Sequence, residues 1–202
     1  NKPKRSDILS VFAGIRPLVR GGDSSNTSKL GRDHEVRISS TGLISVLGGK
    51  WTTYRKMAED CVDHAARLAE LKPAECTTKS MHVHGHPGEA SREQFNEYGS
   101  DATALEQLIA STPNANEQLA ERLPYVAGQA IFAARHEMAR SVEDVLARRT
   151  RALFLDAEAA IAAAPRVAAL LSAELHRDAK WQADQLEVFR LLADAYRPAS
   201  AS

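Results

Sequence analysis

The stretch Leu43-Ile-Ser-Val-Leu-Gly-Gly-Lys-Trp-Thr-Thr-Tyr-Arg-Lys-Met-Ala-Glu-Asp60 decides how the first part of the chain folds. It begins with an apolar run of the length of a buried strand, which Gly48–Gly49 interrupts, and Thr52 or Thr53 can then cap a helix. A strand, a glycine turn and a helix start place several backbone N–H groups together, and the helix dipole and Lys50 add positive charge there. The stretch predicts an anion-binding turn or, equally, an ordinary strand-to-helix turn with a solvated lysine.

The composition is that of an ordinary soluble globular protein, with 44% hydrophobic and 26% charged residues in a chain of 202. Lys plus Arg equals Asp plus Glu at 26 each, so no overall field favours nucleic acid or an anionic bilayer. No apolar run is long enough to span a membrane, and the N-terminal residues lack the apolar core of a signal peptide. The chain starts without Met and almost directly enters an apolar segment, which indicates a piece of a longer protein.

The first sixty residues predict three strands and one helix. Residues 7–13 are mostly apolar, so we expect a strand that is covered on both faces. Gly14 ends it, and Pro17 holds Arg16 in an extended conformation. After a polar loop, residues 32–39 predict a second strand, and the apolar run from Leu43 predicts the third. This is too little structure to close a core unaided.

From about residue 86 the sequence is rich in Ala, Leu, Glu and Arg with a helical period, which predicts an all-helical domain. Pro73 and residues 77–88 mark the boundary, and Pro165 is expected to separate two helices. Ser141 to Asp144 fits a capping box. The fold class is therefore α+β, with predicted boundaries at 1–72, 73–88 and 89–202. The expected helices are 90–98, 101–111, 115–122, 125–138, 142–149, 151–163, 166–176 and 179–196.

Three charged or polar clusters of this chain have simple structural interpretations. In the segment Met81 to His86, His82 and His84 alternate and could bind a metal, but no Cys, Asp or Glu stands at ligand spacing. Gly85 and Pro87 suggest a turn, so a histidine-rich surface turn is favoured and no metal site is expected. Asp144 and Arg148 predict an ion pair at a helix end. The pair His136-Glu137 predicts a satisfied interior or interface role.

Four cationic or ionisable side chains fall at the ends of predicted strands: Arg16, Arg32, His34 and Lys50. Strand ends next to glycine turns are where α/β proteins place ligands. Two arginines can fork onto a phosphate or carboxylate, and a lysine can support a developing negative charge. These residues together predict a small anionic ligand, although a structural salt bridge remains an alternative for each.

Three motifs in the first sixty residues of this chain resemble those of one family. Gly14-Ile-Arg-Pro-Leu-Val19, Arg32-Asp-His-Glu35 and Gly48-Gly-Lys-Trp-Thr-Thr-Tyr-Arg-Lys-Met-Ala-Glu59 are similar to the FAD-dependent (aerobic, respiratory) glycerol-3-phosphate dehydrogenases. Val142-Glu-Asp-Val-Leu-Ala-Arg-Arg-Thr-Arg151 is similar to a motif of that family's helical C-terminal domain. The resemblance covers essentially the whole chain. The chain lacks the Gly-x-Gly-x-x-Gly fingerprint of the family's dinucleotide-binding domain. The resemblance therefore implies the C-terminal portion of such an enzyme: the end of the FAD/substrate region (1–72), a linker (73–88) and the helical domain (89–202).

The resemblance also implies roles for individual residues. Arg16 and Arg32 would hold the phosphate and hydroxyl oxygens of the substrate. Lys50 and the amides of Gly49, Trp51 and Thr52 would meet the pyrimidine edge of a flavin, most of which is held by the missing N-terminal region. No residue here is assigned as the catalytic base.

The implied reaction is the oxidation of sn-glycerol 3-phosphate to dihydroxyacetone phosphate, with electrons passing through FAD to quinone. Quinone use implies a cytoplasmic protein peripheral to a bacterial inner membrane, and a homodimer is left open. The isolated fragment should be inactive. Two other hypotheses remain: another glycine/D-amino-acid-oxidase-like flavoenzyme acting on a carboxylate substrate, and a non-catalytic helical module for interaction or dimerisation.

Overall fold

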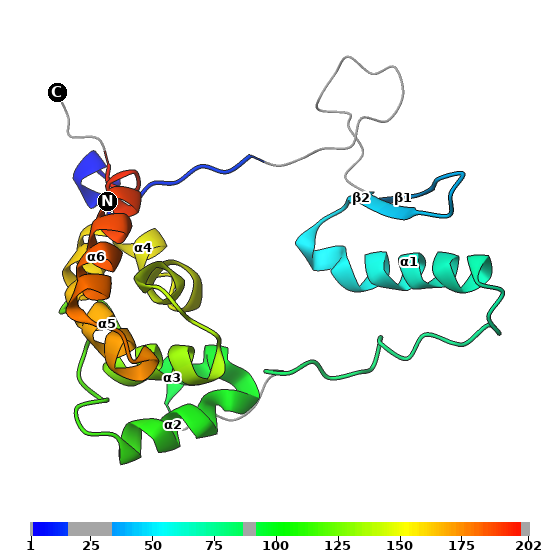
Figure 1. Cartoon of the computed structure of the whole chain (residues 1–202). Coiled ribbons are helices and arrows are strands. Elements are labelled where there is room, and N and C mark those ends of the chain that lie inside the picture. The colour runs from blue at the N-terminus through cyan, green and yellow to red at the C-terminus, as the bar shows by residue number, and fades with distance from the viewer. Residues whose placement is uncertain (1, 16–33, 87–91, 199–202) are drawn as a thin grey trace. The chain divides into compact units, whose positions relative to one another are not determined.

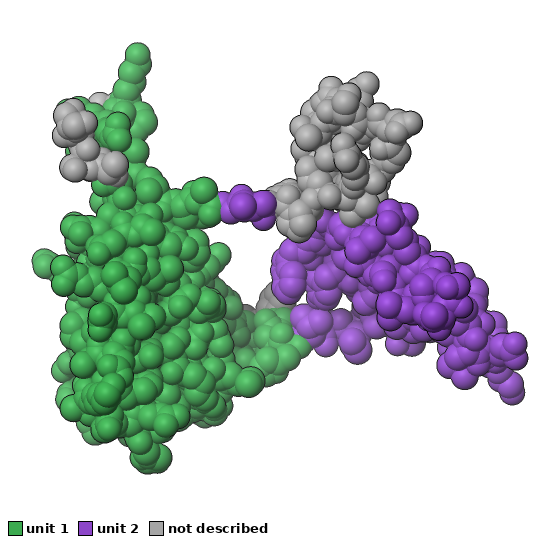
Figure 2. All heavy atoms as spheres, turned by 45° about the horizontal axis from the view of Figure 1, so that its top comes forward, with its two compact units in different colours: residues 1–13, 84–202 green, residues 14–83 purple. Residues whose placement is uncertain are grey.

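The computed structural model describes residues 2–15, 34–86 and 92–198 (Figure 1). The chain forms two compact units, each of which is described by itself (Figure 2). Residues 14–83 form the hairpin unit, and residues 1–13 with 84–202 form the helical unit. The boundaries at 1–72, 73–88 and 89–202 refer to the domains of a longer protein and stay a prediction. The fold class is confirmed: a small β-hairpin with its helix accompanies an otherwise helical chain.

The hairpin unit contains two of the three predicted strands. β1 (His34–Ile38) pairs antiparallel with β2 (Ile44–Gly48), and His34 lies opposite Gly48 in the register. The turn between the strands closes at Gly42, which has a φ of 83°. A single 3₁₀ turn, η3 (Trp51–Thr53), follows β2 and leads into α1 (Tyr54–Leu68). The predicted order of strand, glycine turn and helix is therefore confirmed.

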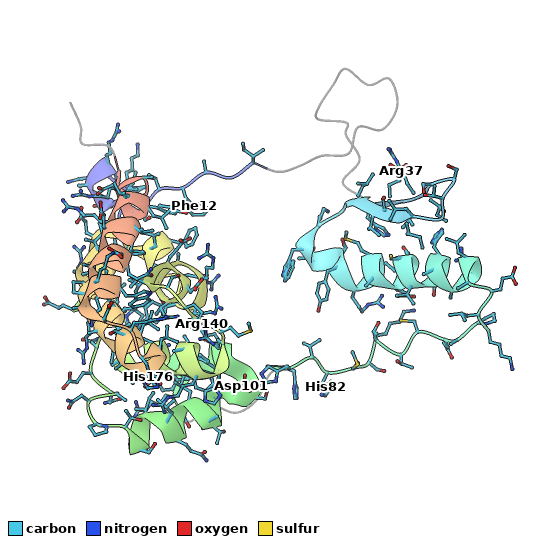
Figure 3. All side chains as sticks on the ribbon, in the orientation of Figure 1. Phe12, Arg37, His82, Asp101, Arg140 and His176 are labelled. Atoms are coloured by element: carbon cyan, nitrogen blue, oxygen red, sulfur yellow. The ribbon has the colours of Figure 1, made fainter. Side chains whose placement is uncertain are left out.

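Side chains alternate across the hairpin as the pleat requires. His34 and Val36 are half-buried, whereas Glu35 and Arg37 are exposed and pair with each other at 2.8 Å. Arg37 lies on the face of the hairpin turned away from α1 (Figure 3). No described residue of β1, β2 or α1 is fully buried, since one hairpin and one helix offer little surface to pack on.

The helical unit packs around one long helix, α5 (Ala157–Leu175), which contacts α3 (Ala127–His136), α4 (Ala152–Leu155) and α6 (Ala179–Asp194). Its larger core includes Leu146, Leu171 and Phe189. A second cluster lies between α3, α2 (Ala102–Ser111) and η4 (Glu93–Asp101), a 3₁₀ segment. Between α3 and α4, η5 (Asp144–Arg149) is a π-helix.

Several helices differ from the sequence-based expectation. The predicted helix 115–122 is absent: this stretch forms turns and a single β-bridge between Gln118 and Val126. The predicted boundary at Pro165 is wrong, because α5 continues through it and buries Ala163, Ala164 and Val167 on its neighbours. Packing on several elements therefore outweighs the local cost of a proline inside a helix.

The predicted strand 7–13 is also wrong. After a 3₁₀ turn at Arg5–Asp7, the backbone is extended but enters no sheet among the described residues. It bonds instead to chain segments at helix ends: the Val11 N–H donates to the Tyr196 carbonyl at 2.8 Å, and the Leu9 carbonyl accepts from the Ala157 N–H at 3.2 Å. We call residues 9–12 the N-terminal clip.

Side chains of the N-terminal clip reinforce these bonds. Ser10 Oγ donates to the Leu153 carbonyl at 2.7 Å. Phe12 meets Phe154 edge-to-face at 4.9 Å between centroids, and Phe154 meets Tyr196 in the same way at 5.4 Å. Phe12 nevertheless stays 67% exposed, so the expectation that this segment is covered on both faces does not hold in this chain.

Candidate functional site

The turn after β2 has a backbone that only glycine adopts easily. Gly48 and Gly49 have φ angles of 71° and 78°, in the left-handed region. A Cβ on Gly49 would lie 2.5 Å from Met57 Sδ and 3.2 Å from His34 Cβ. Both the dihedral angle and the space therefore require glycine at position 49, and α1 and β1 supply the side chains beneath it.

Thr53 closes this turn instead of capping α1. Its Oγ1 accepts from the Lys50 N–H at 3.2 Å and donates to the Lys50 carbonyl at 3.0 Å. The prediction that a threonine side chain caps α1 is thus wrong. Thr53 directly precedes α1, but its side chain makes no hydrogen bond to the backbone of that helix. The Lys50 amide is consequently occupied.

The next two amides are available to a ligand. Among the described residues, the N–H groups of Trp51 and Thr52 donate to no other group, as expected for the first turn of a helix. Lys50 is exposed and forms no ion pair within the described part of the chain. Trp51 is 85% exposed and stacks on Tyr54 with 5.5 Å between ring centroids. Two N–H donors, an ammonium and a flat aromatic surface thus lie along one short segment.

An ion-paired network connects β1 to α1 beside the turn. His34 Nε2 lies 2.8 Å from Asp60 Oδ2, and Lys56 Nζ lies 2.7 Å from Asp60 Oδ1. Hydrogen bonds from Lys56 and, to a smaller extent, from His34 hold the pKa of the Asp60 carboxyl below its usual value, against the opposing effect of desolvation. Asp60 is therefore a carboxylate at neutral pH.

Sequence reasoning found part of this arrangement. Gly49, Lys50, Trp51 and Thr52 all lie in the turn as the motif requires, and their flavin-binding role stays a prediction. Arg16 and Arg32 lie outside the described residues, so their substrate-binding role also stays a prediction. His34 was singled out without a role. Asp60 was missed, because no local pattern relates it to His34, which lies 26 residues earlier in the chain.

The helical unit contains a separate polar cavity of about 330 Å³, lined by His84, Gly85, Glu97, Tyr98, Asp101, Glu137 and Arg149. Arg149 donates from Nε and Nη2 to the Glu137 carbonyl at the end of α3, at 3.1 and 2.5 Å. This arginine of the helical motif therefore caps a helix. His84 pairs with Asp101 at 2.7 Å, in the surface turn that was predicted.

The hydrogen bonding of Glu137 differs from the expectation. Its Oε2 atom is buried without a hydrogen-bond partner among the described residues, so the predicted satisfied role is wrong for this atom. Desolvation raises the pKa of this carboxyl, and Arg149 opposes the change only in part. Among the described residues, no cluster of His, Cys, Asp or Glu has the geometry of a metal site.

The predicted ion pair at the end of the helical motif is confirmed. Arg148 Nη1 lies 3.2 Å from Asp144 Oδ1, and Arg148 Nη2 lies 2.6 Å from Glu143. Both bonds of the predicted capping box are also present, between Ser141 and Asp144. Within the described ranges, none of the helices combines the length and the apolar character that crossing a bilayer requires.

Comparisons with known proteins show which family the chain is similar to. The family model of the C-terminal domain of alpha-glycerophosphate oxidase matches residues 39–182. The mitochondrial glycerol-3-phosphate dehydrogenase SDP6 of Arabidopsis thaliana is 32% identical over 97% of this chain and 36% of its own length. The human mitochondrial glycerol-3-phosphate dehydrogenase is 32% identical over 93% of this chain and 28% of its own. The chain thus spans about a third of the length of these relatives.

One solved structure has the same fold. The glycerol-3-phosphate dehydrogenase of Bacillus halodurans, solved in complex with FAD, superposes with a TM-score of 0.73 at 24% sequence identity. The match covers 100% of this chain and 43% of that one. The similarity extends over both compact units.

Proposed function

The chain belongs to the family of the C-terminal domain of alpha-glycerophosphate oxidase, and on this premise we propose that it is the C-terminal portion of an FAD-dependent glycerol-3-phosphate dehydrogenase. The full-length enzyme would oxidise sn-glycerol 3-phosphate to dihydroxyacetone phosphate and pass the electrons to quinone. The relatives named above are glycerol-3-phosphate dehydrogenases, and this does not favour the alternative of an amino-acid-oxidising flavoenzyme.

The turn Gly48–Thr53 fits one edge of a flavin. FAD, when bound, supplies the two-electron acceptor for the carbinol hydrogen. The free N–H groups of Trp51 and Thr52 and the ammonium of Lys50 would lie at its pyrimidine edge, where negative charge develops on reduction. Gly49 lets the turn lie directly on Met57 and His34, where a Cβ would not fit. The observation that carries the proposal is a combination at this turn: two amides and a lysine without a partner among the described residues, and a backbone that requires glycine.

The remaining roles in the reaction are divided between this chain and the rest of the enzyme. Arg16 and Arg32 would bind and orient the anionic substrate, since guanidinium groups fork onto phosphate oxygens. The proton acceptor for the substrate hydroxyl is unassigned in this chain. Most of the FAD would be held by the preceding region, so the 202-residue chain alone should be inactive and should bind flavin weakly.

The reaction can be tested with the full-length enzyme under anaerobic conditions. We expect glycerol 3-phosphate to bleach the flavin absorbance near-stoichiometrically, whereas glycine and D-amino acids leave it unchanged. A Lys50→Gln variant should bind or reduce its flavin less well, because it loses the only full charge at the turn. Lys72→Gln, a change of an exposed lysine after α1, is the matched control. Bleaching by an amino acid instead of glycerol 3-phosphate would refute the proposal.

We also propose quinone as the electron acceptor, a location at the cytoplasmic face of a bacterial inner membrane, and a homodimer as one candidate assembly. The motif resemblance supports quinone and membrane attachment. Cell fractionation of the full-length protein, with quinone-analogue reduction measured in each fraction, tests both. Light scattering of the full-length protein, with and without residues 90–202, tests whether the helical domain dimerises.

A further inference from the structure

We infer that His34 and Asp60 are positioning residues for the flavin-binding turn, an inference that rests on the proposed function. Neither side chain belongs to Gly48–Thr53, yet together they hold the two elements between which this turn is suspended. The proposal is that the pair fixes where the amides of Trp51 and Thr52 lie relative to a bound flavin.

His34 lies directly beneath the turn. It is the register partner of Gly48, at the last pair of the hairpin. Its Cβ is one of the two side-chain groups that would be within 3.2 Å of a Cβ on Gly49; the other is Met57. A displacement of His34 therefore changes the surface on which the turn rests.

Asp60, on α1, holds the imidazole of His34 through the contact at Nε2. It lies one helical turn after Lys56 and Met57 on α1, so the same helix face supplies the floor of the turn and the anchor for His34. The side chains of His34 and Asp60 are only 17% and 27% exposed, compared with 55% and 47% for Arg37 and Glu35 on the outer face. Partial shielding from water makes the inner pair worth more than a surface ion pair.

The other charged groups around Asp60 do not substitute for His34. Lys56 contacts the second carboxylate oxygen and also lies 3.5 Å from Glu59, and it comes from α1 itself. His64 Nδ1 contacts the Asp60 carbonyl, at 2.7 Å, and not its carboxylate. Among these contacts, the one from His34 connects α1 to the hairpin. Loss of that contact should loosen β1 against α1 without removing any group that touches the flavin.

The test compares variants of the full-length holoenzyme in which the contact is lost or retained. His34→Leu and Asp60→Asn should each raise the Kd for FAD at least about 5-fold and shift the visible flavin spectrum. His34→Gln should stay within about 2-fold, because its side-chain amide nitrogen can replace the donor Nε2. Glu35→Gln, which alters only the exposed neighbouring pair, is the matched control. Thermal midpoints measured in parallel show how far each variant loses stability.

The outcomes separate the two proposals. If His34→Leu and Asp60→Asn lower the thermal midpoint but leave the Kd and spectrum of FAD unchanged, the pair is only structural and the inference is overturned. If the unmodified enzyme binds no FAD, the proposed function fails. The positioning claim is then decided by amide exchange of residues 49–53, which His34→Leu must accelerate and His34→Gln must not.

Discussion

Gly49→Ala offers a direct measure of how tightly the turn is built. An alanine at a φ of 78° pays the cost of the left-handed region, about 1–2 kcal/mol, less roughly 0.5 kcal/mol gained by restricting the unfolded chain. Its Cβ would also lie 2.5 Å from Met57 Sδ and 3.2 Å from His34 Cβ. Overpacking of this kind costs a further 1–3 kcal/mol. We therefore expect a loss of about 2–4 kcal/mol in the opening free energy of the hairpin unit.

Gly42→Ala is the matched control. Gly42 has nearly the same φ, 83°, but a Cβ there would have no neighbour within 4 Å. It should cost only the dihedral term, about 1 kcal/mol. In the double variant with Met57→Ala, the steric part of the Gly49→Ala cost should be largely relieved, which gives a coupling of about 1–2 kcal/mol.

The assay is hydrogen exchange of the full-length enzyme, followed in peptides that cover β1, β2 and α1. In the regime where exchange reports the opening equilibrium, a loss of 2 kcal/mol accelerates exchange roughly 30-fold. Flavin content provides a second readout. Equal effects of Gly49→Ala and Gly42→Ala, within about 0.5 kcal/mol, would show that Met57 and His34 do not confine the turn.

Three further predictions concern the helical unit. Gln129→Met should lower the free energy of unfolding by about 2–4 kcal/mol in urea titrations, since the buried amide accepts from the Val126 N–H at 2.9 Å and donates to Tyr98 Oη at 3.0 Å; an unchanged value would refute its capping role. Phe154→Ala should release the N-terminal clip and speed proteolysis within residues 8–13, whereas Leu155→Ala, at an exposed neighbour, should not. Burial raises the folded-state pKa of Glu137 above its ordinary value of 4.5. The free energy of unfolding should therefore fall as the pH rises from 4.5 through the folded-state pKa. Glu137→Gln should remove that decline, and an unaltered pH profile would contradict this reasoning.

The parts of the fold that the sequence predicts well are those with a local cause. The helix predicted at 101–111 is α2 within one residue, and those predicted at 125–138 and 179–196 contain α3 and α6, because apolar positions recur at a helical period. The capping box at Ser141 is local in the same sense. The turn at Gly48–Gly49 is predicted because two successive glycines after an apolar run end a strand and favour a turn.

The errors arise where distant residues decide the conformation. Pro165 stays inside α5 because that helix is buried along much of its length, which a local rule about proline cannot register. Residues 7–13 have the composition of a strand, but their partners in this chain are carbonyls and amides near residues 153–157 and 196. Likewise, His34 and Asp60 are 26 residues apart, and no periodicity relates them.

The N-terminal clip has a consequence for biosynthesis. Ser10 bonds to Leu153, 143 residues later, and Val11 bonds to Tyr196, which comes still later in the sequence. At a synthesis rate of about 5–20 residues per second, the ribosome needs roughly 10–40 s after making the clip before the last of its partners exists. Until then, the docking surface for Leu9, Val11 and Phe12 in the helical unit is incomplete. Chaperone binding to this nascent segment should therefore end only when α6 has emerged.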